Sequence, residues 1–184
     1  NDKLSFELCI NGKDVIVDPG TYVYTPNPEQ RNKFRSTDYH NTVCIDGQEQ
    51  NDFAKDSLFS MKNNTKTECL KWETNNDVDI FIGRHKGYER FEYPIMHRRK
   101  IKFYKKENKI EINDTFRGDG QHNLEWNLYI KDKNNINYIL DKKINWHNEA
   151  TDISPNYGCK ISVEKINGKY FGDLNNNFFQ TISW

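Results

Sequence analysis

The sequence has no excess of charge of either sign and no long apolar run. Its 27 basic and 27 acidic residues balance, which argues against a globally basic nucleic-acid binder, although local basic patches remain possible. No stretch approaches the roughly 20 apolar residues that a membrane-spanning helix needs, and the first residues do not form a signal peptide. We therefore expect no nucleic-acid partner and no membrane span.

Cysteine is sparse and has no motif spacing. The four cysteines, Cys9, Cys44, Cys69 and Cys159, include no Cys-x-x-Cys pair, which excludes a zinc ribbon or a thioredoxin-type motif. Free thiols are the favoured interpretation, and a disulfide between strands is the minority one. The sequence does not fix the redox compartment.

Hydrophobic residues make up only 35% of the chain, yet aromatic residues reach 14%, a profile that favours β structure. An alternating hairpin is expected around Asn11-Gly12, with strands at 4–10 and 15–17. Further short apolar segments predict strands at 42–45, 58–61, 67–74, 78–82, 96–105, 109–113, 122–130, 136–140, 143–146, 159–166 and 178–184. Asn/Lys-rich stretches at 131–137 and 167–177 are expected to be solvated loops. This pattern predicts one all-β domain over 1–184, an antiparallel β-sandwich.

The segment from Asp18 to Gln48 concentrates the chemistry of the chain in one long connection. Asp18 and His40 come from the ends of two strands and could share a divalent ion such as zinc. Two ligands do not make a metal site, and the alternatives are an ordinary Asp-Pro-Gly turn and a structural histidine. We expect the two side chains to converge at the rim of the sandwich.

The same connection holds candidate ligand-binding residues. Arg31 and Arg35 could bind carboxylate or sulfate groups of an acidic ligand, or they could form surface salt bridges. Tyr22, Tyr24 and Tyr39 could stack on sugar rings, although core packing explains them equally well. We single out Arg31, Arg35 and Tyr39 as substrate-binding candidates.

Two histidine-containing segments lie in or beside predicted strands. They are His85-Lys-Gly-Tyr88 and His97-Arg-Arg99. Proton transfer is one possibility, but a solvated basic face is the favoured interpretation. His122 and His147 receive no role, and no catalytic residue is assigned.

Taken together, these stretches resemble the C-terminal β-sheet domain of heparinase II/III-like polysaccharide lyases. The block from Asp18 to Gly47 is the most specific part of the resemblance. The other matching segments are weak individually, but they run in the family's order across most of the chain: 2–6, 85–88, 97–99, 113–114 and 154–158.

The resemblance implies a supersandwich-like β domain that follows an (α/α) toroid, with the substrate in the cleft between them. The implied reaction is β-elimination on a uronic-acid-containing polysaccharide, with the main catalytic residues on the toroid. This chain opens almost directly into a strand without a methionine, which we interpret as a segment of a longer protein. Alone it is expected to be inactive, while the full-length enzyme would act outside the cytoplasm, in the periplasm or extracellularly.

The resemblance also implies a zinc ion in the β domain for some members, with Asp18 and His40 as two ligands and a third just before Asn1. Where the family often has a histidine at a strand end, this chain has Leu128-Tyr129-Ile130, so the contribution of that strand stays open. The alternative function is a non-catalytic module that binds acidic polysaccharide or serves in polysaccharide biosynthesis. Which uronic polymer is bound cannot be deduced from these residues.

Overall fold

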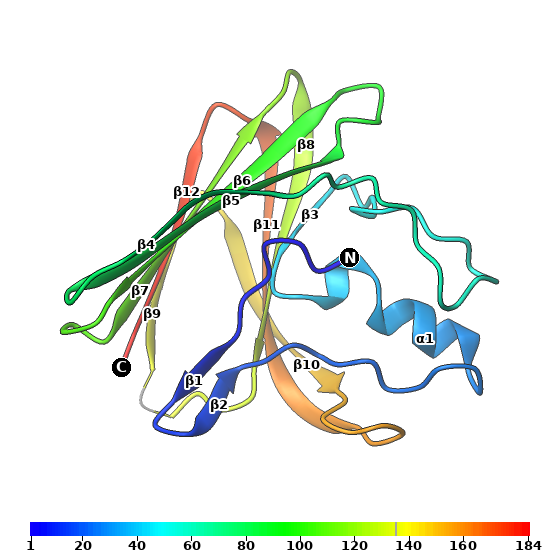
Figure 1. Ribbon diagram of the computed structural model, residues 1–184, viewed down its shortest axis with the longest axis horizontal. Coiled ribbons are helices and arrows are strands. Elements are labelled where there is room, and N and C mark those ends of the chain that lie inside the picture. Colours follow the sequence, from blue (N-terminus) through cyan, green and yellow to red (C-terminus); the bar gives the residue numbers. More distant parts are fainter. Residues whose placement is uncertain (135) are drawn as a thin grey trace.

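Two antiparallel sheets form the sandwich, as the sequence predicts (Figure 1). The computed structural model describes residues 1–134 and 136–184. The strands are β1 Leu8–Ile10, β2 Lys13–Ile16, β3 Val43–Ile45, β4 Glu68–Thr74, β5 Val78–Tyr88, β6 Ile95–Tyr104, β7 Lys109–Arg117, β8 Gln121–Ile130, β9 Asn137–Leu140, β10 Asn145–Ile153, β11 Ile161–Asp173 and β12 Asn177–Ser183. The first sheet has the order β1-β2-β8-β11-β10, with β3 also paired to β8, and the second has the order β4-β5-β6-β7-β12-β9.

Aromatic side chains fill one part of the space between the sheets, next to a second cluster whose buried members, such as Ile16, Ile112 and Ile130, are aliphatic. Trp126, Phe178 and Tyr88 are each at most 1% exposed. The Trp126 and Phe178 rings lie 4.9 Å apart between centroids, and Phe116 meets both edge-on. Each buried aromatic side chain removes about 150–250 Å² from water, so a few of them form a large core.

Two of the predicted elements are wrong. No strand forms at 58–61 among the described residues; this segment lies in a loop, where the carbonyls of Ser57 and Ser60 accept hydrogen bonds from Arg35 at 3.0 and 3.2 Å. The loop predicted at 167–177 is largely strand, because β11 continues to Asp173. Asn167 is polar but buried, and its amide donates to the Asn127 side chain at 2.7 Å. Residue 135, within the loop predicted at 131–137, lies outside the described residues.

A short helix, α1 (Pro28–Phe34), and a 3-10 turn, η1 (Thr37–Tyr39), interrupt the long connection. Asn27 caps α1 by accepting a hydrogen bond from the Gln30 amide at 3.0 Å, and Pro28 begins the helix. Seven residues are too few to establish a helical period in the sequence. Figure 1 shows α1, η1 and the N-terminus together on one side of the sandwich, with the C-terminus on the other. No helix among the described residues has the length and apolarity that crossing a membrane would require.

The basic face predicted for His85, His97 and Arg99 is wrong, because their side chains point between the sheets. His85 and His97 are fully buried, and Arg99 is 2% exposed. Asp114, also fully buried, receives hydrogen bonds from Arg99 at 2.8 and 2.9 Å, from His97 at 2.7 Å and from the Trp126 indole at 3.0 Å. These five residues form a buried charge cluster that joins both sheets.

The hydrogen bonds of this cluster fix the tautomers of its two histidines. The Gly87 amide donates to His85 Nδ1, so that nitrogen carries no proton. His85 Nε2–H then donates to His97 Nδ1 at 3.3 Å, and His97 Nε2–H donates to Asp114. Both imidazoles are therefore neutral, which agrees with burial lowering the pKa of each.

All four cysteines are free thiols. Cys44 is buried on β3, and burial raises the pKa of its thiol far above its usual value. Such a thiol is unreactive at neutral pH.

Candidate functional site

Asp18 and His40 converge, as the sequence predicts. Asp18 follows β2 and His40 follows η1, and the carboxylate Oδ2 lies 2.6 Å from the imidazole Nδ1. The His40 side chain is 9% exposed, whereas that of Asp18 is 32% exposed. The pair therefore sits at the surface end of the long connection, open to a ligand from one side.

The Asp-Pro-Gly turn places the carboxylate. Asp18 Oδ1 accepts a hydrogen bond from the Gly20 amide at 2.8 Å, so both carboxylate oxygens have a partner. Gly20 has a φ of 80°, and a Cβ at this position would collide with the Ser154 carbonyl. The Pro19 carbonyl accepts from the Ser154 amide at 2.7 Å. The turn is thus docked on the segment that follows β10.

Asn41 fixes the neighbouring histidine from inside the fold. Its side chain is buried and donates to the carbonyls of Phe6 and Val17 at 3.0 and 2.9 Å. Its Oδ1 accepts from the Tyr129 amide at 2.8 Å. One side chain therefore connects the N-terminal segment, the end of β2 and β8, and it holds the backbone of His40 in place.

The second ring nitrogen of His40 has no hydrogen-bond partner among the described residues. The imidazole borders a hollow of about 290 Å³, together with Asp2, Asp18, Arg31 and Phe59. A carboxylate on Nδ1 orients the ring and places the proton on that nitrogen, which leaves the lone pair of Nε2 facing the hollow. Nε2 can therefore take part in proton transfer, whereas a zinc ion shared by both side chains would have to be bound by Nδ1, the nitrogen that faces Asp18.

The donor chemistry of Asp18 and His40 suits zinc, but their number does not complete a site. No group of three or more His, Cys, Asp or Glu side chains that could hold a metal occurs within residues 1–134 and 136–184. Two tetrahedral zinc ligands stand roughly 3.3 Å apart, and the present contact of 2.6 Å is shorter. Zinc binding would need a further ligand and a small separation of the pair.

The two candidate arginines differ in what their guanidinium groups contact. Arg35 is 6% exposed and donates four hydrogen bonds, to the Asn32 side chain and to the carbonyls of Ala54, Ser57 and Ser60. The Arg31 guanidinium makes a single hydrogen bond within the described chain, through Nε to the Leu58 carbonyl. Arg31 therefore keeps its terminal nitrogens available for a ligand, while Arg35 holds the loop that borders the hollow.

The candidate tyrosines occupy three different environments. Tyr39 is 5% exposed and donates its hydroxyl to the Asp152 carbonyl at 2.7 Å, so it packs in the core. Tyr22 is half-buried against Phe34, with ring centroids 5.4 Å apart. Tyr24 is 46% exposed. A substrate contact through Tyr39 stays a prediction, and this structure would have to rearrange for it.

Tyr24 belongs to an exposed aromatic group that the sequence analysis missed, here called the aromatic rim and comprising Tyr24, Phe59 and Tyr157. Phe59 is 69% and Tyr157 is 59% exposed, and their ring centroids lie 5.8 and 5.4 Å from that of Tyr24. The Arg31 guanidinium sits 5.6 Å from the Tyr24 centroid. Phe59 falls in the segment misread as a strand, and Tyr157 gave no signal beyond its position in the resemblance.

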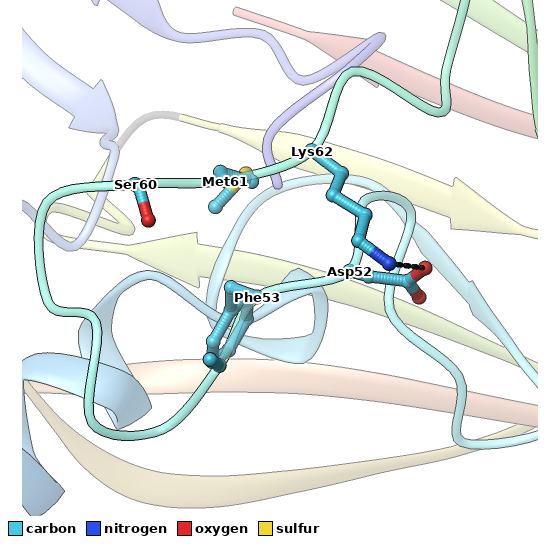
Figure 2. Close-up of a pocket in the computed structure, with 6 residues that line it drawn as sticks. Asp52, Phe53, Ser60, Met61 and Lys62 are labelled. Atoms are coloured by element: carbon cyan, nitrogen blue, oxygen red, sulfur yellow. Dashed lines mark ion pairs between the residues drawn. The ribbon is translucent and has the colours of Figure 1, made fainter.

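A second hollow, of about 560 Å³, lies beside the first and shares Ser60 and Met61 with it. Figure 2 shows Phe53 on one run of the loop, facing Ser60 and Met61 on the other, with Lys62 reaching Asp52 at 3.9 Å. The Arg35 guanidinium lies 4.0 Å from the Phe53 ring centroid. The loop that borders both hollows is thus anchored through Arg35.

His122, to which the sequence analysis gave no role, forms a separate ion pair with Asp46 at 2.7 Å. Its Nε2 also lies 3.0 Å from the Asp119 carbonyl, which can only accept. Burial lowers the pKa of His122, but the hydrogen bonds to Asp119 and Asp46 outweigh this and raise it above its usual value. The ring is therefore held as an imidazolium that ties the β7–β8 turn to the end of β3.

Comparison with known proteins gives a consistent result. Residues 1–179 match the family model for the heparinase II/III-like C-terminal domain. The chain is 29% identical over 149 residues to a heparin-sulfate lyase of Pedobacter heparinus, covering 78% of this chain and 19% of that protein. It is 32% identical over 107 residues to a heparin-sulfate lyase of Bacteroides stercoris, covering 55% of this chain and 13% of that protein.

Solved structures agree on the fold. The crystal structure of the heparan sulfate lyase HepC from Pedobacter heparinus superposes with a TM-score of 0.76 at 20% identity, over 99% of this chain and 30% of that one. A heparinase III structure gives a TM-score of 0.73 at 17% identity, over 98% of this chain and 29% of that one. The chain spans less than a third of the length of each of these relatives. From the family match and the shared sandwich, this chain belongs to the heparinase II/III-like C-terminal domain family.

Proposed function

We propose that this chain is the β-sandwich part of a polysaccharide lyase that cleaves uronic-acid-containing glycans by β-elimination. The observation that carries the proposal is the grouping of Asp18, His40, Arg31 and Phe59 around one hollow of about 290 Å³, with the other two rings of the aromatic rim extending from Phe59, in a chain of this family. The two curated relatives named above are heparin-sulfate lyases. In this proposal the hollow forms one wall of the substrate cleft, and a helical toroid elsewhere in the same protein forms the other.

The reaction sets clear physical demands. A base removes the proton α to the uronic carboxylate, the electron pair forms a C=C bond, the C–O bond to the neighbouring sugar breaks, and an acid protonates the leaving oxygen. The α proton is weakly acidic, so the carboxylate charge must be neutralised in the transition state. Arg31 can pair with such a carboxylate through its terminal nitrogens. The exposed faces of Tyr24 and Phe59 can pack on the apolar side of a sugar ring.

We further propose that Asp18 and His40 provide two ligands of a structural zinc ion, completed by a ligand from outside this chain. A bound zinc would fix the turn and the end of η1 relative to each other, and it would shape this wall of the cleft. The proposal rests on the donor types and on their convergence at 2.6 Å. In keeping with its polysaccharide substrate, we propose that the full-length protein works in the periplasm or outside the cell.

A second candidate function is binding of acidic polysaccharide without chemistry. The exposed aromatic rim and the available Arg31 nitrogens support it, because both are binding features that need no catalytic group. A role in polysaccharide biosynthesis uses the same features. An assay of product formation distinguishes the lyase from the binding module.

The test uses the full-length protein and a panel of uronic polysaccharides, beginning with heparan sulfate. The lyase proposal expects ultraviolet absorbance to rise as unsaturated product forms, and it expects Arg31→Ala to raise KM. Lys55→Ala, an exposed neighbour in the adjoining loop, serves as the charge-matched control and should behave like the parent. Absence of cleavage for every polymer, with retained binding that Arg31→Ala weakens, would favour the binding module instead.

A further inference from the structure

A row of basic side chains runs along the outer face of the second sheet. Arg98, Lys100 and Lys102 occupy alternate positions of β6 and point away from the core, while Arg99 and Ile101 between them point inward. Alternate residues on a strand stand roughly 6.6 Å apart. The three positive charges therefore form a straight row of roughly 13 Å on the molecular surface.

Basic side chains of β5 and β4 flank this row on one side, while β7 places Glu111 directly opposite Lys102 on the other. Arg84 on β5 lies directly opposite Arg98, and Lys71 on β4 lies opposite Ile82, the partner of Lys100. Like charges in adjacent positions of a sheet repel each other. The pKa of Lys100 is lowered by partial burial and by the charges of Lys102, Arg98 and Lys71.

The acidic side chains on this face do not neutralise the row. Glu68 pairs with Arg84 at 2.7 Å, and Glu73 pairs with Lys71 at 2.5 Å. Glu111 accepts from the Tyr104 hydroxyl at 2.8 Å and pairs with Lys109 at 3.5 Å, and Lys102 reaches it only indirectly, by donating to the same Tyr104 hydroxyl at 3.4 Å. Arg98, Lys100 and Lys102 make no ion pair within the part of the chain that the structure describes.

Protection of a sheet edge does not explain these charges. Lysines often guard edge strands against pairing with other chains, but β6 lies in the interior of its sheet, between β5 and β7. Glutamates share this face, as on most solvated surfaces, but their ion pairs are with cations outside the row. A row of one sign on a central strand, held against its own repulsion, instead suits a polyanionic partner.

We propose that Arg98, Lys100 and Lys102 form a second binding surface, which holds an extended acidic polysaccharide through its carboxylate or sulfate groups. The choice of polysaccharide over nucleic acid rests on the proposed function. The row belongs to the second sheet, whereas Asp18 and His40 lie on connections of the first. It would therefore hold a stretch of a long polymer outside the cleft and leave short oligosaccharides unaffected.

The test compares three forms of the full-length protein. The first is the parent, and the second carries Arg98→Gln, Lys100→Gln and Lys102→Gln. The third, a charge-matched control, carries Lys13→Gln, Lys142→Gln and Lys169→Gln, three exposed lysines elsewhere on the surface without ion pairs in the described structure. Circular dichroism confirms folding. Binding of long heparan sulfate chains and of a hexasaccharide is then measured by fluorescence anisotropy at several salt concentrations.

The expected result is a loss of affinity for long chains of roughly tenfold in the β6 triple variant, with a weaker salt dependence. The control should stay within about twofold of the parent, and hexasaccharide binding should not change. Equal affinity of all three forms for long heparan sulfate chains would overturn the proposal. It would also be overturned if single-stranded DNA, but no acidic polysaccharide, displaced the bound polymer. A protein that cleaves no polymer but shows the expected loss would refute the lyase function and leave this surface standing.

Discussion

Two His–Asp pairs in this domain have the same chemistry and opposite surroundings. His97 and Asp114 lie fully buried between the sheets, where every carboxylate lone pair has a donor. His40 and Asp18 meet at a similar distance, but they border a hollow, and the second nitrogen of His40 is without a partner in the described chain. A saturated pair can only hold structure, whereas a pair with an open nitrogen can act on a ligand.

Burial also determines how much stability is lost when either pair is disrupted. The Arg99 and His97 interactions hold the pKa of Asp114 well below its usual range despite complete burial, so removing that carboxylate leaves a buried guanidinium without its counter-charge. Asp18 is one-third exposed, and water can replace a lost partner there. The comparison therefore predicts that substitutions in the buried charge cluster lower stability strongly and that substitutions of the Asp18–His40 pair lower it little.

The largest effect is expected for Asp114→Asn. The substitution replaces an acceptor by an amide that faces the donors of Arg99, His97 and Trp126. We expect the free energy of unfolding to fall by about 3–5 kcal/mol. Urea denaturation measures the loss, with Asp56→Asn, an exposed aspartate, as the control that should change little. A loss below about 1 kcal/mol would mean that the cluster does not carry the charge balance described here.

The two arginines of the long connection sharpen the comparison. Arg35→Ala removes four hydrogen bonds, three to carbonyl groups of the loop from Ala54 to Ser60 and one to the Asn32 side chain. We expect a loss of about 2–3 kcal/mol in urea denaturation. Arg31→Ala is the matched variant and should lose about 0.5 kcal/mol or less, because its terminal nitrogens hold nothing within the described chain. Equal losses would contradict the division of the two arginines into anchor and ligand contact.

The pH dependence of stability should separate the neutral histidines from His122. Burial lowers the pKa of His85 and His97 in the folded state, so the unfolded chain binds more protons as the pH falls below about 6.5. We expect about 1–3 kcal/mol less stability at pH about 5.5 than at about 7.5. His85→Gln should flatten this acid loss.

The contribution of His122 to stability depends on pH in the opposite sense, because hydrogen bonds raise its folded pKa although burial opposes them. Its contribution is present at acid pH and disappears as the pH rises through the raised value. His122→Gln should therefore cost more stability at pH about 5.5 than at about 8.5. Urea denaturation at each pH measures both variants, and a larger cost for His122→Gln at the alkaline pH would refute the imidazolium assignment.

The smallest effect on stability is expected at the Asp18–His40 pair. Asp18→Asn should change the free energy of unfolding by about 1 kcal/mol or less. In the full-length protein the same variant should lower the zinc content, measured by atomic emission, because a ligating carboxylate is lost. Asp38→Asn, an exposed aspartate two residues before His40, is the control. An unchanged zinc content, or none in the parent, would remove the metal role of Asp18.

The apolar alternation in the sequence was sufficient to predict most of the strands. The position of Asp18 and His40 at the ends of two predicted strands was sufficient to predict that they converge. Alternation gave a wrong prediction where a side chain, and not a partner strand, supplies the hydrogen bonds of the backbone. Arg35 does this for carbonyl groups within residues 54–60. Alternation also failed where polar residues were buried in β11, because Asn167 has the composition of a loop but finds its partners on β8. In both cases the deciding contacts come from residues distant along the chain.

Local chemistry alone determined that this chain forms short alternating strands, an Asp-Pro-Gly turn and an antiparallel sandwich. Only the tertiary structure decided that His97 is buried and His40 is open, that Arg35 anchors while Arg31 stays available, and that Tyr24 meets Phe59 and Tyr157. The reason is physical. Alternation assigns a side chain to a face, but the packing of the other sheet and the loops decides whether that face is covered.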